Sequence, residues 1–378
     1  MRGSVINDPE LLAVIARNYA SNKIGDELVS ELVGVQFEAL VAKEGYRLLP
    51  PQEKPVVMNV KGASASGKST IRPQQRQLAT SLGIPWEDFA LISPDYWRKY
   101  LLDYDSLGED YKYAAMLTGQ ELAIIDKKLD RYMAQKASKG DVLHLLIDRF
   151  RFDSFTVDNG RSQDSKLLSR FGDRVFLFFM ITPPAETLVR AWERGLVTGR
   201  YKSVDDLLYH NIEAYTGIPA LFFSRMQSID KYVHFEFLDN NVPKGDLPKT
   251  IAFGKNNSMT ILDLESMGNI DRFRRVNIEA SSPDEVLIDD CGDNDHEFVS
   301  RCVAELSKVR ITDVNTGRLV AKYHKGQIEY FDKQALRGLD GFEAYEELFP
   351  MDSIPLDVSE HDPEYTTPSD KIYTLGYW

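Results

Sequence analysis

The eight residues "GASASGKS", from Gly62 to Ser69, have the types and spacing of a loop that binds phosphate. They fit the pattern G-x-x-x-x-G-K-[ST] without a mismatch. Backbone N–H groups can close around phosphate oxygens only where side chains are small or absent, and glycine permits the unusual dihedral angles that such a loop needs. In this chemistry Lys68 bridges the β- and γ-phosphates and the Ser69 hydroxyl binds Mg²⁺. The remaining predicted contacts with the nucleotide are Ser64, Ser66, Gly67 and Thr70.

The flanking segments support this interpretation. The apolar stretch "VVMNVKG" before the loop predicts a strand, and "GKSTIRPQQRQLATSLG" after it predicts a helix. A helix that begins near Lys68 directs the positive end of its dipole at the phosphates. A strand, the loop and a helix in this order are the context in which the motif binds a nucleoside triphosphate, and we expect ATP rather than GTP.

Two carboxylates follow predicted strands further along the chain. Asp95 comes just after "FALIS", where it would accept a proton from an attacking hydroxyl or cap the helix that begins at Tyr96. Asp148 ends "VLHLLID", where it would hold Mg²⁺, directly or through water, or pair with Arg149 or Arg151. Ligands bind beyond the carboxyl ends of strands in open parallel sheets, so both positions suit a site.

Three arginines lie close together in "LVRAWERGLVTGRYKS", namely Arg190, Arg194 and Arg200. Arg190 and Arg194 are four residues apart and share a helix face. A segment with glycines at 195 and 199 suits a lid that closes over a triphosphate and neutralises its charge. The alternative is a solvated helix face on which Arg190 pairs with Glu186 or Glu193.

These residues need a scaffold, and the chain supplies strands that alternate with helices over residues 55 to 240. After the three strands named above, "RVFLFFMI" is a continuous apolar strand of the type buried on both faces, and "YVHFEFLDN" is a fifth strand. Helices are predicted at "GQELAIIDKKLDRYMAQKASKG", "SQDSKLLSRFG" and "PPAETLVRAWERG". This alternation predicts an α/β fold with a parallel sheet covered by helices.

The two ends of the chain have a different pattern. Residues 8 to 48 predict helices, the first with Asp8 as its N-cap and Pro9 at its first position. After Asn240 the pattern changes to strands and hairpins, with turns at "NTG" and "HKGQ". We therefore expect a helical N-terminal extension (1–50), an α/β domain that contains the phosphate loop (51–245) and an accessory β-containing domain (246–378).

Composition limits the classes of function. The 378 residues carry a formal net charge of −13, which argues against a general binder of nucleic acid. Two cysteines make neither a disulfide framework nor a zinc site, so a reducing, cytoplasmic compartment is expected. The sequence contains no apolar run long enough to span a bilayer, and we expect no membrane partner.

An ordered series of segments resembles the zeta-toxin-type kinases over roughly residues 55 to 241. "ISPDYWRKYLLDY" is similar to the I-N-P-D-E-I-K segment of that family and its L-P-E-Y continuation. "LTGQELAIIDKKLDRYMAQKASKGDVLHLLID" resembles the helix and strand that follow, "FFMITPPAETLVRAWERGLVTGR" the strand, helix and arginine-bearing lid, and "VHFEFLDNN" the closing strand.

The resemblance implies a P-loop kinase that uses ATP and Mg²⁺. It implies that Asp95 is the general base, that Arg190 and Arg194 belong to the lid, and that Glu121 contacts the substrate. Toxin members of the family phosphorylate a hydroxyl of UDP-N-acetylglucosamine, so a nucleotide-sugar is the first acceptor expected, and an antitoxin-like protein is a candidate partner for the terminal regions.

Two alternatives stay open. One is a kinase of a nucleoside, an antibiotic or a nucleic-acid end. The other is an interaction protein that acts through residues 246–378 and is only stabilised by nucleotide. Asp95 distinguishes a kinase from the second alternative, since a pure binding module has no need of a base at that position.

Overall fold

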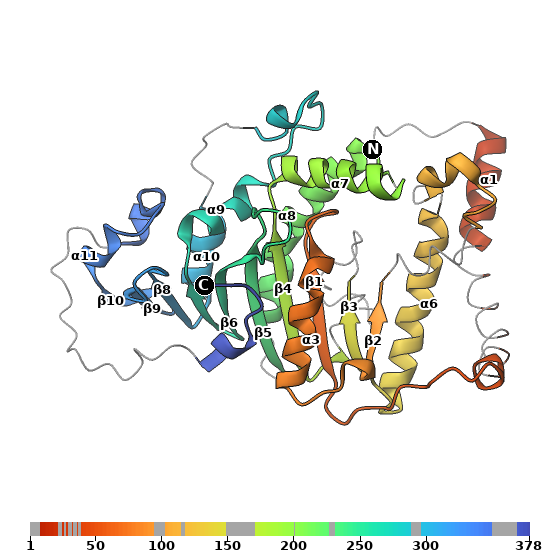
Figure 1. The fold of residues 1–378 in the computed structure, drawn as a ribbon, viewed down its shortest axis with the longest axis horizontal. Coiled ribbons are helices and arrows are strands. Elements are labelled where there is room, and N and C mark those ends of the chain that lie inside the picture. Colours follow the sequence, from red (N-terminus) through yellow and green to blue (C-terminus); the bar gives the residue numbers. More distant parts are fainter. Residues whose placement is uncertain are drawn as a thin grey trace.

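The computed structural model describes residues 8–21, 25, 28, 32, 36, 39–93, 103–114, 118–148, 171–199, 201–226, 231–288, 296–349 and 369–378. Within these ranges, ten strands form one sheet in the order β10-β9-β8-β7-β6-β5-β4-β1-β3-β2 (Figure 1). The strands are β1 (Val56–Lys61), β2 (Phe89–Ile92), β3 (His144–Ile147), β4 (Arg174–Ile181), β5 (Tyr232–Asp239), β6 (Lys249–Lys255), β7 (Ser258–Ile261), β8 (Lys308–Thr312), β9 (Leu319–His324) and β10 (Gln327–Phe331).

Helices surround this sheet. The α-helices of the described ranges are α1 (Pro9–Ala20), α3 (Arg72–Ser81), α6 (Gly119–Ser138), α7 (Pro184–Thr198), α8 (Val204–Met226), α9 (Leu264–Arg272), α10 (Glu297–Glu305) and α11 (Lys333–Leu336). Short 3-10 turns are η2 (Lys68–Ile71), η3 (Trp86–Asp88), η4 (Gly108–Tyr113), η7 (Pro283–Glu285), η8 (Phe342–Leu348) and η10 (Ser369–Tyr373). No described helix is long and apolar enough to cross a membrane.

The five strands expected between residues 55 and 240 are confirmed, and they are parallel. β1 pairs with β3 on one side and β4 on the other, β2 pairs with β3, and β5 pairs with β4. The chain leaves β1 for the edge strand β2, returns through β3 and then crosses to β4. The direction of winding therefore reverses at β1, and in open sheets such a switch point is where ligands bind.

The apolar strands explain how the sheet is covered. In β4, residues from Val175 to Ile181 are all buried, as the continuous apolar run predicts. Phe176, Phe178 and Met180 pack with α3 and the last residues of the chain. Val175, Leu177, Phe179 and Ile181 pack with α8, α9 and α10. The expected layers, helix on both faces of a parallel sheet, are therefore confirmed.

The change of pattern after Asn240 is also confirmed as strands and hairpins. β6 runs antiparallel to β5 and to β7, β8 runs parallel to β7, and β9 runs antiparallel to β8 and β10. Gly317, at the "NTG" turn, has φ of 69°, which glycine adopts without strain. The expected boundary at residue 245 thus falls between two paired strands of one sheet, and one apolar cluster includes residues from both sides of it.

Two further predictions concern the N-terminal helices and the helix expected at 162–172. Asp8 caps α1 by accepting from the N–H groups of Glu10 and Leu11, as predicted, and no residue of α1 is buried. Of the second expected N-terminal helix, residues 25, 28, 32, 36 and 39–43 are described, and all of them are helical. The helix expected at 162–172 lies outside the described residues, apart from Phe171 and Gly172.

Candidate phosphate-binding site

The loop from Gly62 to Lys68 leaves β1 and leads directly into η2 and α3. Gly67 has φ of 89°, in the left-handed region that favours glycine, and a Cβ there would overlap the side-chain amide of Asn240. A Cβ on Gly62 would lie 2.7 Å from Ser66 Oγ and 2.8 Å from Met180 O. Both glycines of the motif are therefore required by close approach, and the loop is compact because of them.

Lys68 turns back over this loop. Its Nζ donates to the backbone carbonyls of Gly62 at 3.1 Å and of Ala63 at 2.6 Å. The partly buried ammonium group is therefore held against the backbone of the loop in which the sequence predicts phosphate binding.

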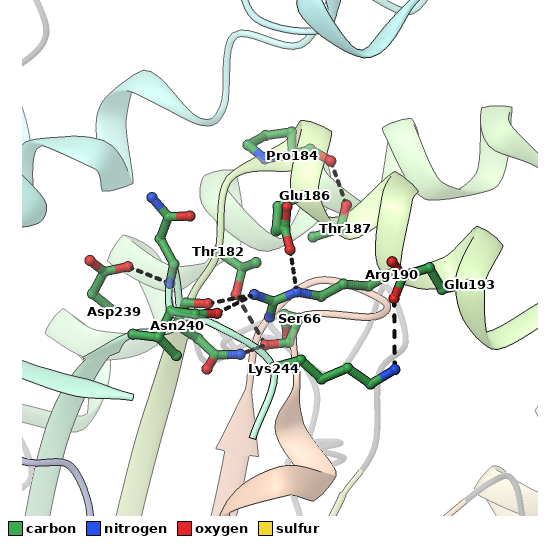
Figure 2. A network of polar contacts seen from close by, with 12 residues as sticks. Ser66, Thr182, Pro184, Glu186, Thr187, Arg190, Glu193, Asp239, Asn240 and Lys244 are labelled. Carbon is green, nitrogen blue, oxygen red and sulfur yellow. Dashed lines mark hydrogen bonds and ion pairs between the residues drawn. The ribbon is translucent and has the colours of Figure 1, made fainter. Parts of the chain in front are cut away.

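Residues that follow two other strands, β4 and β5, support the loop by hydrogen bonds. Ser66 O accepts hydrogen bonds from Thr182 Oγ1 at 3.0 Å and from Asn240 Nδ2 at 2.8 Å (Figure 2). Thr182 follows β4 and Asn240 follows β5, so the carboxyl ends of three neighbouring parallel strands meet at one carbonyl group. This convergence follows from the parallel order, because such strands end at the same edge.

Tyr215 of α8 fixes the Thr182 backbone. The tyrosine hydroxyl donates to Thr182 O at 2.6 Å and accepts from Thr182 N at 2.7 Å. Burial raises the pKa of Tyr215 well above its usual value, so the hydroxyl stays protonated and can make both bonds.

The Arg190 guanidinium joins α7 to the segment that follows β5. Its Nη2 donates to Asn240 O at 2.9 Å and to Val242 O at 3.3 Å, and its Nε donates to Glu186 at 2.8 Å (Figure 2). The ion pair with Glu186 is the one that the solvated-face alternative named. In this structure the arginine expected in a lid braces the backbone beside the loop.

Lys202, which the sequence did not single out, reaches the tip of the loop. It lies between α7 and α8, and its Nζ is 3.2 Å from Ser64 Oγ and in contact with Nδ1 of His210. The spacing carried a signal that was not used, because Lys202 stands two residues after Arg200 in the same expected lid.

Asp148 lies at the carboxyl end of β3, next to β1 in the sheet. Its Oδ2 accepts from Arg72 Nη2 at 3.1 Å, and both side chains are largely covered. The pairing partner is thus the first residue of α3 rather than Arg149 or Arg151, both of which lie outside the described residues. The contact places a carboxylate beside the helix that follows the loop.

The residues that the sequence predicts to bind Mg²⁺ offer oxygen atoms, which are the ligands that this ion prefers. Ser69 is exposed in η2, and Asp148 follows the neighbouring strand. Among the described residues, no three His, Cys, Asp or Glu side chains gather as a metal site. Mg²⁺ is commonly held by one or two protein ligands together with substrate phosphates, so this donor set fits the ion.

The other predicted residues are placed less closely together. Thr70 Oγ1 donates to Gly67 O at 2.6 Å and so steadies the end of the loop. Arg194 is exposed on α7, and Glu121 is exposed in the first turn of α6. Asp95 and Arg200 lie outside the described residues.

Comparison with known proteins gives distant likenesses. No family model matches the chain, and no curated protein matches its sequence. A solved structure from the PezAT chromosomal toxin–antitoxin system of Streptococcus pneumoniae is similar, with 17% identity and a TM-score of 0.37 over 55% of this chain and 78% of that one. A candidate kinase from Chloroflexus aurantiacus has 22% identity and a TM-score of 0.26 over 41% of this chain and 73% of that one. Likenesses this low carry no argument about activity.

Proposed function

We propose that this protein is an ATP-dependent phosphotransferase that moves the γ-phosphoryl group to a hydroxyl of a small acceptor. The observation that supports it best is the compact loop after β1, with Lys68 Nζ against the carbonyls of Gly62 and Ala63 and with β4 and β5 supporting Ser66. A compact loop with a G-x-x-x-x-G-K-S sequence, between a strand and a helix, fits the phosphates of a nucleotide.

Each residue of the site has a part in this reaction. The backbone N–H groups of the loop would hold the phosphates, and Lys68 would offset the charge on the β- and γ-phosphates. Ser69 and Asp148 would hold Mg²⁺, which neutralises phosphate charge when it is bound. Asp95 would orient the acceptor hydroxyl and take its proton while the acceptor oxygen bonds to phosphorus and the bond to the β-phosphate oxygen breaks. The transition state is loose, so positioning and charge neutralisation are the main requirements.

The acceptor is proposed by class. A nucleotide-sugar such as UDP-N-acetylglucosamine is the first to test, and a nucleoside, an antibiotic and a nucleic-acid end are the alternatives. The parent chain is incubated with γ-³²P-labelled ATP, Mg²⁺ and each acceptor, and the labelled product is identified by mass. Binding of ATP with no transfer to any acceptor would favour an interaction protein that acts through residues 246–378.

Lys68→Ala tests the phosphate loop itself. We expect transfer to fall by roughly 10²- to 10³-fold, as on removing one group that stabilises transition-state charge. The stabilisation that Mg-ATP gives the parent should also be lost, while the melting temperature without nucleotide stays close to that of the parent. Lys139→Ala, an exposed lysine at the end of α6, is the matched control. Full transfer by Lys68→Ala would refute the assignment.

Asp95→Asn tests the general base. Asn keeps the size of Asp and its ability to cap a helix, but it cannot take a proton, so transfer should fall by roughly 10²-fold or more. ATP affinity, measured by calorimetry, should barely change. If affinity falls together with the rate, Asp95 binds Mg²⁺ instead. Unchanged transfer would mean that Asp95 only caps a helix, with Asp148 the next candidate for the base.

We also propose that the N-terminal extension binds a protein partner. The apolar side chains of Leu11, Leu12 and Ile15 on α1 are 44–49% exposed, and Tyr19 is 60% exposed. Light scattering tests whether a second copy of the chain is that partner. A parent chain that is a dimer and a Leu11→Ser/Ile15→Ser variant that is a monomer would show it. A parent chain that is itself a monomer would exclude it.

A further inference from the structure

Lys202, in the linker between α7 and α8, lies against the tip of the phosphate loop. Lys202 Nζ is 3.2 Å from Ser64 Oγ, although the two residues are 138 positions apart in the chain. Ala65, next to Ser64, has φ of 63°, so the chain turns sharply at this tip. An ammonium group therefore reaches the loop from outside it, in addition to Lys68, which belongs to the loop itself.

The linker is held in place by its neighbours. Gly195 allows the Tyr201 ring to pack directly on α7, and the Tyr201 ring is 5.3 Å from that of Trp192 between centroids. Tyr111 donates its hydroxyl hydrogen to Thr198 O at 2.7 Å, at the end of α7. Because Tyr201 is fixed on the helix, the next residue, Lys202, is presented to the loop by a defined backbone.

His210, in the second turn of α8, holds the other side of the lysine. Its Nδ1 contacts Lys202 Nζ, and the ammonium group can donate to this nitrogen only if the nitrogen carries no proton. His210 and Ser64 thus orient the ammonium group at the tip of the loop.

We propose that Lys202 is a second phosphate-binding cation, which contacts the γ-phosphoryl group of the nucleotide, with His210 as its positioning residue. This inference rests on the proposed function. In a loop of this sequence the backbone holds the α- and β-phosphates and the motif lysine reaches the β- and γ-phosphates. Oxygens of the γ-phosphate then lie where groups from outside the loop can meet them, and Lys202 touches the loop from outside.

The energetic reason is the distribution of charge. During transfer, negative charge is spread over the γ-phosphoryl oxygens and the leaving oxygen. A cation fixed in advance at that place stabilises the charge without further reorganisation. Lys202 is therefore expected to favour ATP over ADP in binding, because ADP lacks the phosphoryl group that it contacts.

Calorimetry with Mg-ATP and Mg-ADP tests the assignment without knowledge of the acceptor. Lys202→Gln keeps hydrogen-bonding capacity but removes the charge. We expect its affinity for Mg-ATP to fall about tenfold or more, as on losing one charge-assisted hydrogen bond, and its affinity for Mg-ADP to change by less than about twofold. Lys202→Arg keeps the charge and should retain most of the preference for ATP. Lys244→Gln is the matched control, since Lys244 is exposed and pairs with Glu193 of α7 at 3.8 Å.

The outcomes separate this inference from the proposed function. If the parent binds neither nucleotide, the proposed function falls and the role of Lys202 falls with it. If the parent binds Mg-ATP, Lys68→Ala does not, and Lys202→Gln keeps the ATP preference, only the role of Lys202 is overturned. Equal losses for ATP and ADP in Lys202→Gln, with a lower melting temperature, would show that the lysine only pins the linker to the loop.

His210 is tested by rescue. His210→Leu removes the acceptor and should lower the preference for ATP by a few-fold, whereas His210→Gln supplies a carbonyl acceptor and should restore it. A Leu variant with the preference of the parent would overturn the positioning role.

Discussion

The two halves of the sheet are built from similar apolar strands but use their strand ends differently. In the parallel half, β1 to β5 run in the same direction, so the residues that follow them gather at one edge. In the mixed half, β6 to β10 mostly alternate in direction, and tight turns at Asn256, Gly317 and Gly326 join the hairpin strands. In the parallel half, polar groups that follow β4 and β5 meet at the loop that follows β1.

Buried polar side chains have different tasks in the two halves. Thr182 and Asn240 both bind the carbonyl group of a loop residue, Ser66. In the mixed half, Asp263 caps α9 and pairs with Lys249, and the Tyr345 hydroxyl donates to Leu264 O. The comparison teaches that strand direction, rather than strand composition, decides where a site can form, while the mixed half mainly supplies core.

The largest expected effect comes from separating the halves. A chain that ends at Asp246 would lack β6 and the cluster residues beyond it, and would expose the edge of β5 with the apolar groups packed around it. We expect insoluble or molten protein without a cooperative unfolding transition, measured by near-ultraviolet circular dichroism. A cooperative, ATP-binding product would instead show that the boundary expected at residue 245 separates two folding units.

A pair of glycines gives the next largest effect. In Gly67→Ala the new methyl group would overlap the Asn240 amide, and alanine would have to adopt a φ of 89°. We therefore expect the loop to rearrange and the stabilisation by Mg-ATP to disappear. Gly317→Ala in the mixed half also has positive φ, 69°, but has open space around it, so it should cost only about 1–2 kcal/mol of unfolding free energy. Thermal unfolding with and without Mg-ATP measures both, and equal loss of nucleotide binding in the two variants would break the comparison.

Two tyrosines make a closer comparison with a smaller effect. The hydroxyls of Tyr215 and Tyr323 each donate to a backbone carbonyl at 2.6 Å, that of Thr182 and that of Leu348. Each Tyr→Phe variant should lose about 1–2 kcal/mol of unfolding free energy. Only Tyr215→Phe should also weaken Mg-ATP binding, because it frees the Thr182 backbone beneath the loop. Titration calorimetry measures the Mg-ATP affinity of the two variants, and urea unfolding measures their stability. Unchanged Mg-ATP binding in Tyr215→Phe would show that α8 does not support the site through this hydroxyl.

The last comparison is a dependence of stability on pH in the strands where the halves join. Glu236 of β5 is fully buried and accepts from Thr250 Oγ1 at 2.7 Å and from the N–H groups of Leu375 and Gly376 at 2.7 and 3.0 Å. Burial raises the pKa of Glu236 from 4.5 to about 7. A raised pKa means that its contribution to stability is complete below about pH 4.5 and is lost as the pH rises through about 7.

Glu236→Gln removes this titration. Between pH 5 and pH 8, about the range over which the folded group loses its proton, the melting temperature of the parent should therefore fall more than that of the variant. His234, buried on the same strand, has its pKa lowered by burial to about 3, so it stays neutral over the range. Parallel melting curves for the two proteins would contradict the predicted titration.

The sequence by itself determined the features that depend on neighbouring residues. The glycines, Lys68 and Ser69 of the loop, the strand before it and the helix after it follow from local spacing and periodicity. The same is true of the Asp8 cap on α1 and of the continuous burial of β4. Each of these needs only the residues within one or two turns or one strand, so a pattern along the chain is enough to predict it.

Tertiary structure alone decided which distant groups meet. The spacing places Lys202 in the expected lid but does not identify Ser64 as its contact, and it does not bring Asn240 to Ser66. The pairing of β6 with β5 that joins the halves is likewise set by packing. The last residues of the chain pack Tyr373 on the rings of Phe176 and His234. The physical reason is that strand order and the two faces of a sheet are fixed by burial of apolar area summed over the whole core, and a local pattern does not contain that sum.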